Sequence, residues 1–169
     1  MTHSIRAILH LTALVFLFMG FAAQAGEGMP QINIRDTVVK LPLEEGVSMD
    51  DAVDSMKLRA NVLNFKLVAH QPLYKELQSM GLESKRIEIF QFCDARIAQV
   101  MISYDKHFAA YLPCRIVLLE DKEGKAWLIT MNLDMLIQSA ELPPELLEKA
   151  EKVRDSIREI MQAGAGGEL

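Results

Sequence analysis

The chain has 169 residues, which is a typical length for one domain. Half of its residues are hydrophobic and 24% are charged, as in a globular protein with a buried core. The formal net charge is −5, and the Lys and Arg residues form no continuous stripe. Because nucleic-acid binding depends on clustered cations that contact phosphates, this composition argues against nucleic acid as a partner.

The first 25 residues have the three-part layout of a secretory signal. Arg6 supplies a positive charge, an apolar run follows from Ala7 to Ala23, and the small residues Ala23 and Ala25 resemble a cleavage site. The run is close to the lower limit for a membrane-spanning helix. We therefore expect residues 1–25 to be removed and the remainder to work in the periplasm. The alternative is an uncleaved anchor that leaves the domain facing the periplasm.

We expect residues 26–31 to form a linker, residues 32–163 a single domain, and the Gly-rich residues 164–169 a flexible tail. Within the domain, β-branched alternation predicts strands, and spacings of three and four apolar residues predict helices. In the first half of the domain we expect a strand over 32–41, a helix over 49–64 capped by Ser48, a strand over 65–70 and a short helix over 73–80. A strand over 86–92, with a bulge near Phe90, and a helix over 95–103, capped by Asp94, are expected next. The chain then forms a hairpin of strands over 116–120 and 126–133 and a final helix that begins at Pro143-Pro144.

This order of elements predicts an α/β (α+β) fold. We expect a two-layer sandwich in which helices pack on one face of a mixed, mostly antiparallel sheet. No internal repeat or low-complexity stretch suggests a second domain.

The two cysteines are the residues with the clearest chemical interest. Cys93 follows a predicted strand and precedes Asp94, where a helix is predicted to begin. The positive end of a helix dipole lowers the pKa of a nearby thiol, which favours a reactive thiolate. Cys114 follows Leu112-Pro113 at the start of the hairpin, so both sulfurs could meet at one edge of the sheet.

Three interpretations of this pair stay open. In an oxidising compartment, two cysteines of a small domain most often form a structural disulfide. Alternatively, they form a functional pair that is redox-active or binds a ligand, or they are two unpaired thiols. If the pair is functional, Asp94, Pro113 and Arg115 lie close to it in sequence and form the expected ligand-binding edge, although Arg115 could equally be a solvated surface cation.

A metal site has weaker support in the sequence. Met101 and His107 could join the thiols as soft ligands that suit Cu(I) or zinc. However, there is no CxxC or HxxxH spacing, and methionines at helical spacing are more often core residues. Motifs for serine hydrolases, nucleotide binding and zinc proteases are also absent, and acids such as Glu88 are expected at the surface.

The region around the cysteines resembles the "domain of unknown function 302" family. The resemblance rests on F-x-x-C-D at 90–94, on L-P-C-R-I at 112–116, and on E-D followed by Gly124 in the hairpin. It implies a compact two-layer α/β domain that is compatible with a dimer. Some members are companions of sulfur-handling or other redox proteins in bacteria, and the resemblance implies no established reaction. It assigns interest to Cys93, Pro113 and Cys114, whereas Asp94-Ala95 departs from the Asn-Pro of many members.

Together these observations favour an exported binding domain that is not an enzyme. Its ligand is undetermined and is expected to involve thiol, sulfur or metal chemistry at Cys93 and Cys114. One alternative is a thiol-disulfide or sulfur-transfer enzyme with Cys93 as nucleophile and Cys114 as resolving thiol. Another is a membrane-anchored accessory subunit of a larger complex. The expected partners are a small ligand or a redox protein, and a homodimer is compatible with the sequence.

Overall fold

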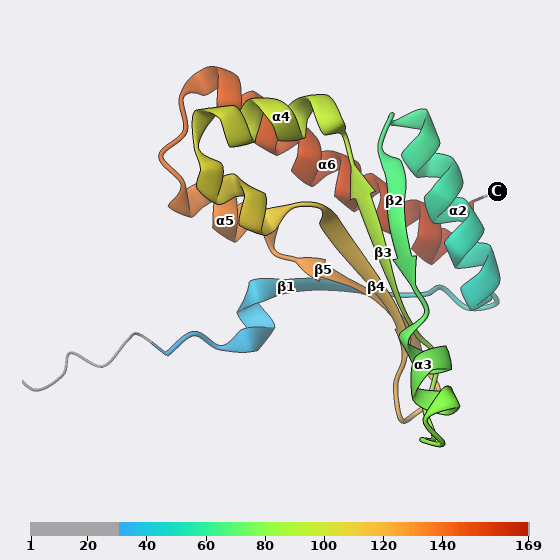
Figure 1. The fold of residues 1–169 in the computed structure, drawn as a ribbon. Coiled ribbons are helices and arrows are strands. Elements are labelled where there is room, and N and C mark those ends of the chain that lie inside the picture. The colour runs from blue at the N-terminus through green and yellow to red at the C-terminus, as the bar shows by residue number, and fades with distance from the viewer. Residues whose placement is uncertain (1–30, 169) are drawn as a thin grey trace, which may run out of the picture. The chain divides into compact units, whose positions relative to one another are not determined.

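A computed structural model describes residues 31–168 of the chain (Figure 1). The expected signal segment and most of the expected linker lie outside these residues. In chain order the elements are η1 (Ile34–Thr37), β1 (Val38–Pro42), α2 (Met49–Val62), β2 (Lys66–Gln71), α3 (Leu73–Ser79), β3 (Ile87–Cys93), α4 (Ala95–Tyr104), η2 (Lys106–Tyr111), β4 (Cys114–Glu120), β5 (Ala126–Met131), α5 (Leu133–Ser139) and α6 (Pro144–Gly166).

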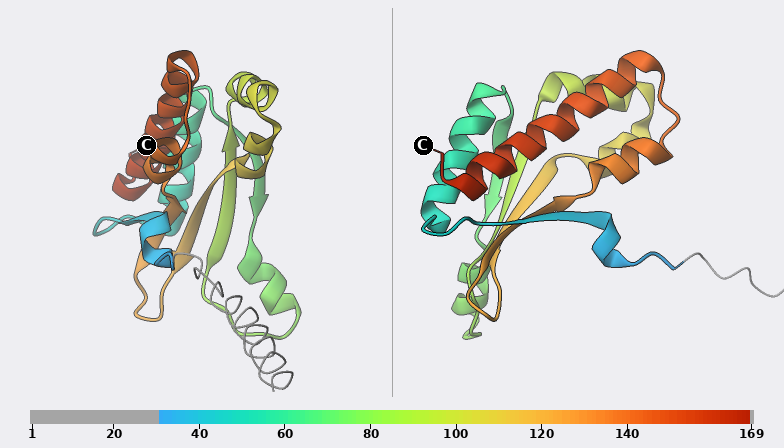
Figure 2. Two further views of the ribbon diagram at one scale, coloured as in Figure 1. Left: turned by 90° about the vertical axis from the view of Figure 1, so that its left-hand side faces the viewer. Right: turned by 180° about the vertical axis from the view of Figure 1, so that it is seen from behind.

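The strands form one antiparallel sheet in the order β1-β5-β4-β3-β2. Helices α2 and α6 pack against each other and cover one face of this sheet, as the two views of Figure 2 show. The expected class, a two-layer α+β sandwich with helices on one face, is therefore confirmed. Every strand pair is antiparallel, so the sheet is more regular than the mixed sheet that we expected.

Local signals explain where the main helices begin. The Ser48 side chain accepts a hydrogen bond from the backbone N–H of Asp51 at 3.1 Å, and the Asp51 carboxylate accepts one in return from the Ser48 backbone. This capping box satisfies two N–H groups that a helix terminus leaves free. Asp94 caps α4 by accepting hydrogen bonds from the backbone N–H groups of Arg96 and Ile97.

The main core lies between the sheet and the α2–α6 layer. Strict alternation along β3 turns Phe90 and Phe92 toward the helices, and both are fully buried. Cross-strand partners on the same face continue the core into β4 and β5. Its largest fully buried apolar side chains are Met56, Phe65, Phe90, Phe92, Ile116, Leu118, Leu128, Ile157 and Ile160.

A second, smaller core lies beyond the end of the sheet. Ile97 and Met101 of α4 pack with Leu146 near the start of α6, and Phe108 of η2 adds to this cluster. The chain between β3 and β4 therefore forms a lobe, made of α4 and η2, that rests against the first half of α6 instead of against the sheet.

A buried carboxylate lies under α2, contrary to the expectation that Glu88 is a surface residue. The Glu88 side chain is 5% exposed, bonds Arg86 and approaches Nε2 of His70 at 2.5 Å. Arg86 also contacts Asp50 at 2.8 Å, and the His70 ring stacks on Phe90 with centroids 4.5 Å apart. Glu88 alternates onto the core face of β3, and these partners compensate for the loss of its hydration.

Four further expectations differ from the structure. Residues 34–37 form a 3-10 helix, and the Asn33 side chain caps it by accepting a hydrogen bond from the Arg35 backbone N–H at 3.1 Å. The first strand therefore begins only at Val38. The bulge lies in β2, between Leu67 and Ala69, and β3 pairs regularly. Helix α5 replaces the end of the second hairpin strand, and η2 was not expected. Within residues 31–168, no helix is both long and apolar enough to cross a membrane.

The expected flexible tail is the fourth difference. Helix α6 continues to Gly166, and Ala163, Gly164 and Ala165 are buried. These small residues allow α6 to approach α2 closely. A Cβ atom on Gly164 would lie 2.5 Å from Cγ of Met56 and 3.0 Å from Cδ1 of Leu128. The Gly-rich composition therefore reflects tight packing and not fraying.

We predict that Gly164→Ala destabilises the fold by about 1–3 kcal/mol, because the added methyl group overpacks the contact with α2. Urea unfolding followed by the fluorescence of Trp127, the single tryptophan, measures this change. Gly166→Ala is the matched control, since its Cβ would meet no atom closer than 3.7 Å. Equal unfolding free energies for the two variants would contradict the packing argument.

We also predict that Arg86→Gln lowers the free energy of unfolding by about 3 kcal/mol, because it removes the guanidinium that pairs with the buried Glu88 carboxylate and leaves His70 as the remaining partner. Lys57→Gln, which breaks a surface pair with Asp54, serves as the control and should cost less than about 0.5 kcal/mol. The double variant Arg86→Met/Glu88→Leu should recover most of the loss. An Arg86→Gln protein as stable as the control would show that Glu88 does not depend on this pair.

Candidate functional site

The candidate site is an apolar cavity of about 80 Å³ beyond the ends of β3 and β4. Its lining comes from the second core and from the strand ends, so six separate elements enclose it. From α4, η2, α5 and α6 come Ile97, Ala98, Met101, Phe108, Tyr111, Leu133, Leu136, Ile137, Ala150 and Val153; the strands and connecting segments add Phe65, Phe92, Cys93, Asp94, Leu112, Cys114, Ala140 and Leu142.

Both cysteines line this cavity. Cys93 is the last residue of β3 and Cys114 is the first residue of β4. Cys114 is the register partner of Phe92, so the two cysteines are offset by one position and strand alternation turns them toward opposite faces of the sheet. Both still line the cavity because each is the terminal residue of its strand. Both are half-buried free thiols, and no disulfide joins them. The structure thus brings both cysteines to one cavity at the ends of their strands, and it shows no disulfide between them.

The pKa values of both thiols are raised, opposite to the expected effect of the helix dipole. Burial, followed by the negative charge of Asp94, raises the pKa of Cys93. Burial, followed by the neighbouring Cys93, raises the pKa of Cys114 to about 11. The dipole argument fails first because the Cys93 thiol is partly buried, and second because Asp94 at the N-cap places a negative charge next to it. Both thiols are accordingly protonated near neutral pH.

Asp94 is the buried charged residue of the site. Burial alone would raise the pKa of its carboxyl group, but hydrogen bonds from the backbone and side chain of Arg96 and from the backbone of Ile97 hold that pKa below its usual value. The carboxylate is thus ionised and is occupied with capping α4. Its role is to orient the start of α4, next to Cys93, and to keep the Cys93 thiol neutral.

The other predicted site residues lie in three different places. Met101 lines the cavity with both thiols. Pro113, which follows a cis peptide bond, and Arg115 instead lie along the opposite face of the sheet. His107 does not line the cavity: its side chain is 79% exposed and its Nδ1 lies 2.6 Å from Asp105. Among the described residues, no group of three His, Cys, Asp or Glu side chains could hold a metal ion.

Sequence reasoning missed the walls that α5 and η2 provide. The signal for α5 was present, because Asn132 is a good N-cap and Leu133, Leu136 and Ile137 follow at helical spacing. For η2 the signal was weaker. Its cap, Asp105, accepts a hydrogen bond from the His107 backbone, but a short 3-10 helix has no long-range periodicity.

The fold and cavity define a small α+β domain with an antiparallel sheet covered by helices on one face. The family described as "Domain of unknown function DUF302" matches residues 39–164, and the chain belongs to this family. The match includes every residue of the cavity lining.

A solved structure supports the same assignment of the fold. The crystal structure of an uncharacterised conserved DUF302 protein from Bacillus stearothermophilus is similar, with a TM-score of 0.64 and 17% sequence identity. The similarity covers 75% of this chain and 97% of that chain. At this identity the likeness concerns the fold. A search of curated proteins finds no match.

We predict that Asp94→Asn speeds the alkylation of Cys93 by iodoacetamide a few-fold at pH 8, because removal of the charge lowers the pKa of Cys93 while asparagine preserves the helix cap. Cys114 should stay slow in both proteins, and its rate should rise only as the pH approaches 11. Mass spectrometry of the alkylated peptides gives both rates.

Asp105→Asn is the matched control for this experiment, since Asp105 is also an N-cap but does not line the cavity. An Asp94→Asn protein that is alkylated at the wild-type rate would show that Asp94 does not suppress the reactivity of Cys93.

Proposed function

We propose that this chain is a non-enzymatic binding domain, exported across the cytoplasmic membrane, that holds a small apolar ligand in the cavity beside Cys93 and Cys114. The observation that carries the proposal is an apolar pocket with two free thiols in its lining. Packed protein cores contain few voids larger than a water molecule. A cavity of about 80 Å³ exceeds the space that one water molecule needs but lies below the roughly 300–1,000 Å³ typical of small-molecule sites, so the proposed ligand is a species of only a few heavy atoms.

The state of the thiols supports binding rather than thiol-disulfide or sulfur-transfer catalysis. A nucleophilic cysteine needs a lowered pKa or an adjacent base. Here the pKa values of Cys93 and Cys114 are raised, and within the described part of the chain no histidine lines the cavity. Neutral thiols in an apolar wall act as weak, polarisable contacts for a ligand.

A soft metal ion is the second candidate ligand. Met101 contributes a third sulfur to the lining that contains Cys93 and Cys114, and soft sulfur ligands suit Cu(I). The metal alternative involves Met101 and excludes His107, which the sequence had offered as an additional ligand.

Export of the domain rests on the N-terminal pattern, since residues 1–30 lie outside the described residues. Arg6, the apolar run from Ala7 to Ala23 and the small residue Ala25 support it. Cleavage after Ala25 would release the domain into the periplasm.

Native and denatured intact masses, measured on protein purified from the periplasmic fraction, test the proposal. We predict a denatured mass that matches residues 26–169, and a native mass larger by a bound species that denaturation releases. The size of the difference separates an organic ligand from a metal ion. A native mass equal to the denatured mass, in protein that was never exposed to a stripping agent, would contradict the proposal.

Ala150→Leu provides the variant for this measurement. Ala150 lines the cavity from α6, so a larger side chain there should exclude the ligand and, by filling the space, raise the free energy of unfolding by about 1 kcal/mol. Ala110→Leu is the control, because Ala110 is exposed in η2 and lies outside the lining. Loss of the bound species from both variants, or from neither, would contradict the assignment of the cavity.

A further inference from the structure

The sheet face opposite α2 and α6, which we call the open face, is apolar on its inner strands. Alternation from the buried Phe90 and Phe92 turns their neighbours away from the helices. Ile89, Val117 and Ile129 are successive cross-strand partners in the middle of this face. The registers place Val38, Lys40 and Pro42 of β1, Trp127, Ile129 and Met131 of β5, Arg115, Val117 and Leu119 of β4, Ile87, Ile89, Gln91 and Cys93 of β3, and Lys66, Ala69 and Gln71 of β2 on it.

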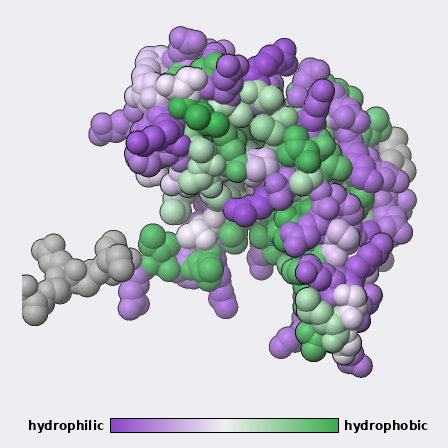
Figure 3. Space-filling view, in the orientation of Figure 1, coloured by the Kyte–Doolittle hydropathy of each residue, from purple (hydrophilic) through white to green (hydrophobic). Residues whose placement is uncertain are grey.

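This pattern differs from that of an ordinary half-exposed sheet. An antiparallel sheet with one face in water normally alternates apolar residues inward and polar residues outward. Here most residues of the inner strands β3, β4 and β5 are apolar on both faces, and Gln91 and Arg115 are the polar exceptions on the open face. Figure 3 looks onto the open face and shows hydrophobic residues around a hollow between the α4–η2 lobe and β1. A contiguous apolar surface of this kind marks a binding site.

The hollow is a groove of about 530 Å³. Ile89, Val117 and Ile129 form its floor, and Tyr111 and Pro113, at the end of η2, form one wall. Its volume falls within the range of small-molecule sites, roughly 300–1,000 Å³. The groove is separate from the thiol cavity, although Cys114 contributes to the lining of both.

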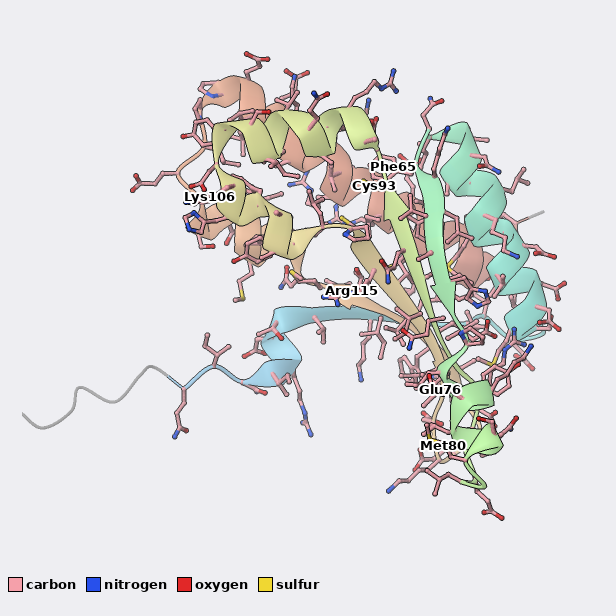
Figure 4. The ribbon with its side chains drawn as sticks, in the orientation of Figure 1. Phe65, Glu76, Met80, Cys93, Lys106 and Arg115 are labelled. Carbon is pink, nitrogen blue, oxygen red and sulfur yellow. The ribbon has the colours of Figure 1, made fainter. Side chains whose placement is uncertain are left out.

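The charges of the open face indicate what occupies the groove. On the described strands, the charged residues of this face are Lys40, Lys66 and Arg115, and all three are cations. Arg115 lines the groove, is exposed, and forms no ion pair with any carboxylate in residues 31–168. Figure 4 shows Arg115 near the end of β4 that carries the η2 connection. Lys40 is already stacked over Trp127 at 4.7 Å.

A second copy of the chain would bring only cations against these cations if two open faces packed together. The chain as a whole has a net charge of −5, yet the charged residues of its open face are all cations. The open face is therefore complementary to an anion. Because the groove is otherwise apolar, the complementary molecule has a long apolar part and one negative group.

We propose that the groove binds a free, single-chain amphiphile with one carboxylate, of the fatty-acid type. The hydrocarbon tail lies along Ile89, Val117 and Ile129, and the carboxylate pairs with the Arg115 guanidinium, whose planar fork matches carboxylate geometry. This groove is distinct from the cavity beside Cys93 and Cys114, and the proposal for it does not depend on the function proposed for that cavity.

Calorimetric titration of the purified protein with decanoate, below its critical micelle concentration, tests this assignment. Saturable binding of one decanoate per chain is expected. Arg115→Gln should weaken decanoate binding about tenfold, because it removes a charge-assisted hydrogen bond. Lys122→Gln, which removes an exposed cation from the hairpin turn, should leave the affinity unchanged. Decanol, which has no charge, should bind both variants equally.

Val117→Asp gives a second, independent test, because a carboxylate in the floor should abolish the binding of decanoate; circular dichroism checks that this variant is folded. Equal affinities of wild type and Arg115→Gln for decanoate, or no saturable binding, would overturn the assignment. Sedimentation of the free protein as a dimer that Val117→Asp separates would assign the face to a second copy. Binding to anionic phosphatidylglycerol vesicles without binding of free decanoate would assign it to a membrane surface.

Discussion

The structure depends on the burial of one face of the sheet beneath α2 and α6. Phe90, Leu128 and Ile160 are fully buried in this layer, and the close approach of α6 at Gly164 completes it. Apolar burial is the dominant favourable contribution to folding, so this layer holds the strands in register. Because one face of the sheet supplies the main core, the other face and the strand ends are free to form sites.

The thiol cavity follows from the way in which α4 joins the fold. Asp94 starts α4 directly after β3, and the helix turns away from the sheet to pack on the first half of α6. The α4–η2 lobe and α5 therefore enclose space beyond the strand ends that the main core does not fill. Cys93 and Cys114 reach this space because they are the terminal residues of two paired strands. The same burial raises the pKa values of both thiols, which supports their proposed role as ligand contacts.

Much of the fold could be predicted from the sequence where local and long-range signals agree. Ser48 and Asp94 are helix caps whose hydrogen bonds are seen in the structure, and the apolar pattern of β3 corresponds to a regular buried strand. Prediction failed where tertiary packing decides. Gly164 lies in a Gly-rich segment of the kind found at frayed chain ends, yet its lack of a side chain allows α6 to pack closely against Met56 of α2. Glutamate is usually a surface residue, yet the position of Glu88 in β3 places its side chain on the core face, where it contacts His70 and Arg86.

The candidate site was only half predictable, for the same reason. The positions of Cys93 and Cys114 at strand ends follow from local pattern, but the cavity wall is assembled from segments distant in sequence. The sign of the pKa shift was missed because burial of the Cys93 thiol, followed by the charge of Asp94, raises its pKa, and neither effect is visible from the position of Cys93 before a helix. Arg115 was expected beside the thiols, but the strand alternation places it on the opposite face of the sheet.

The central claim is that the cavity beside the two thiols holds a ligand. Thiol accessibility in the protein as purified, compared with the same protein after denaturation, removal of small molecules and refolding, tests it most directly. The account predicts that Cys93 and Cys114 are alkylated more slowly in the purified protein than after removal of the bound species, and that Ala150→Leu abolishes this difference. Equal alkylation rates before and after stripping would contradict it, because a ligand in contact with the thiols must shield them.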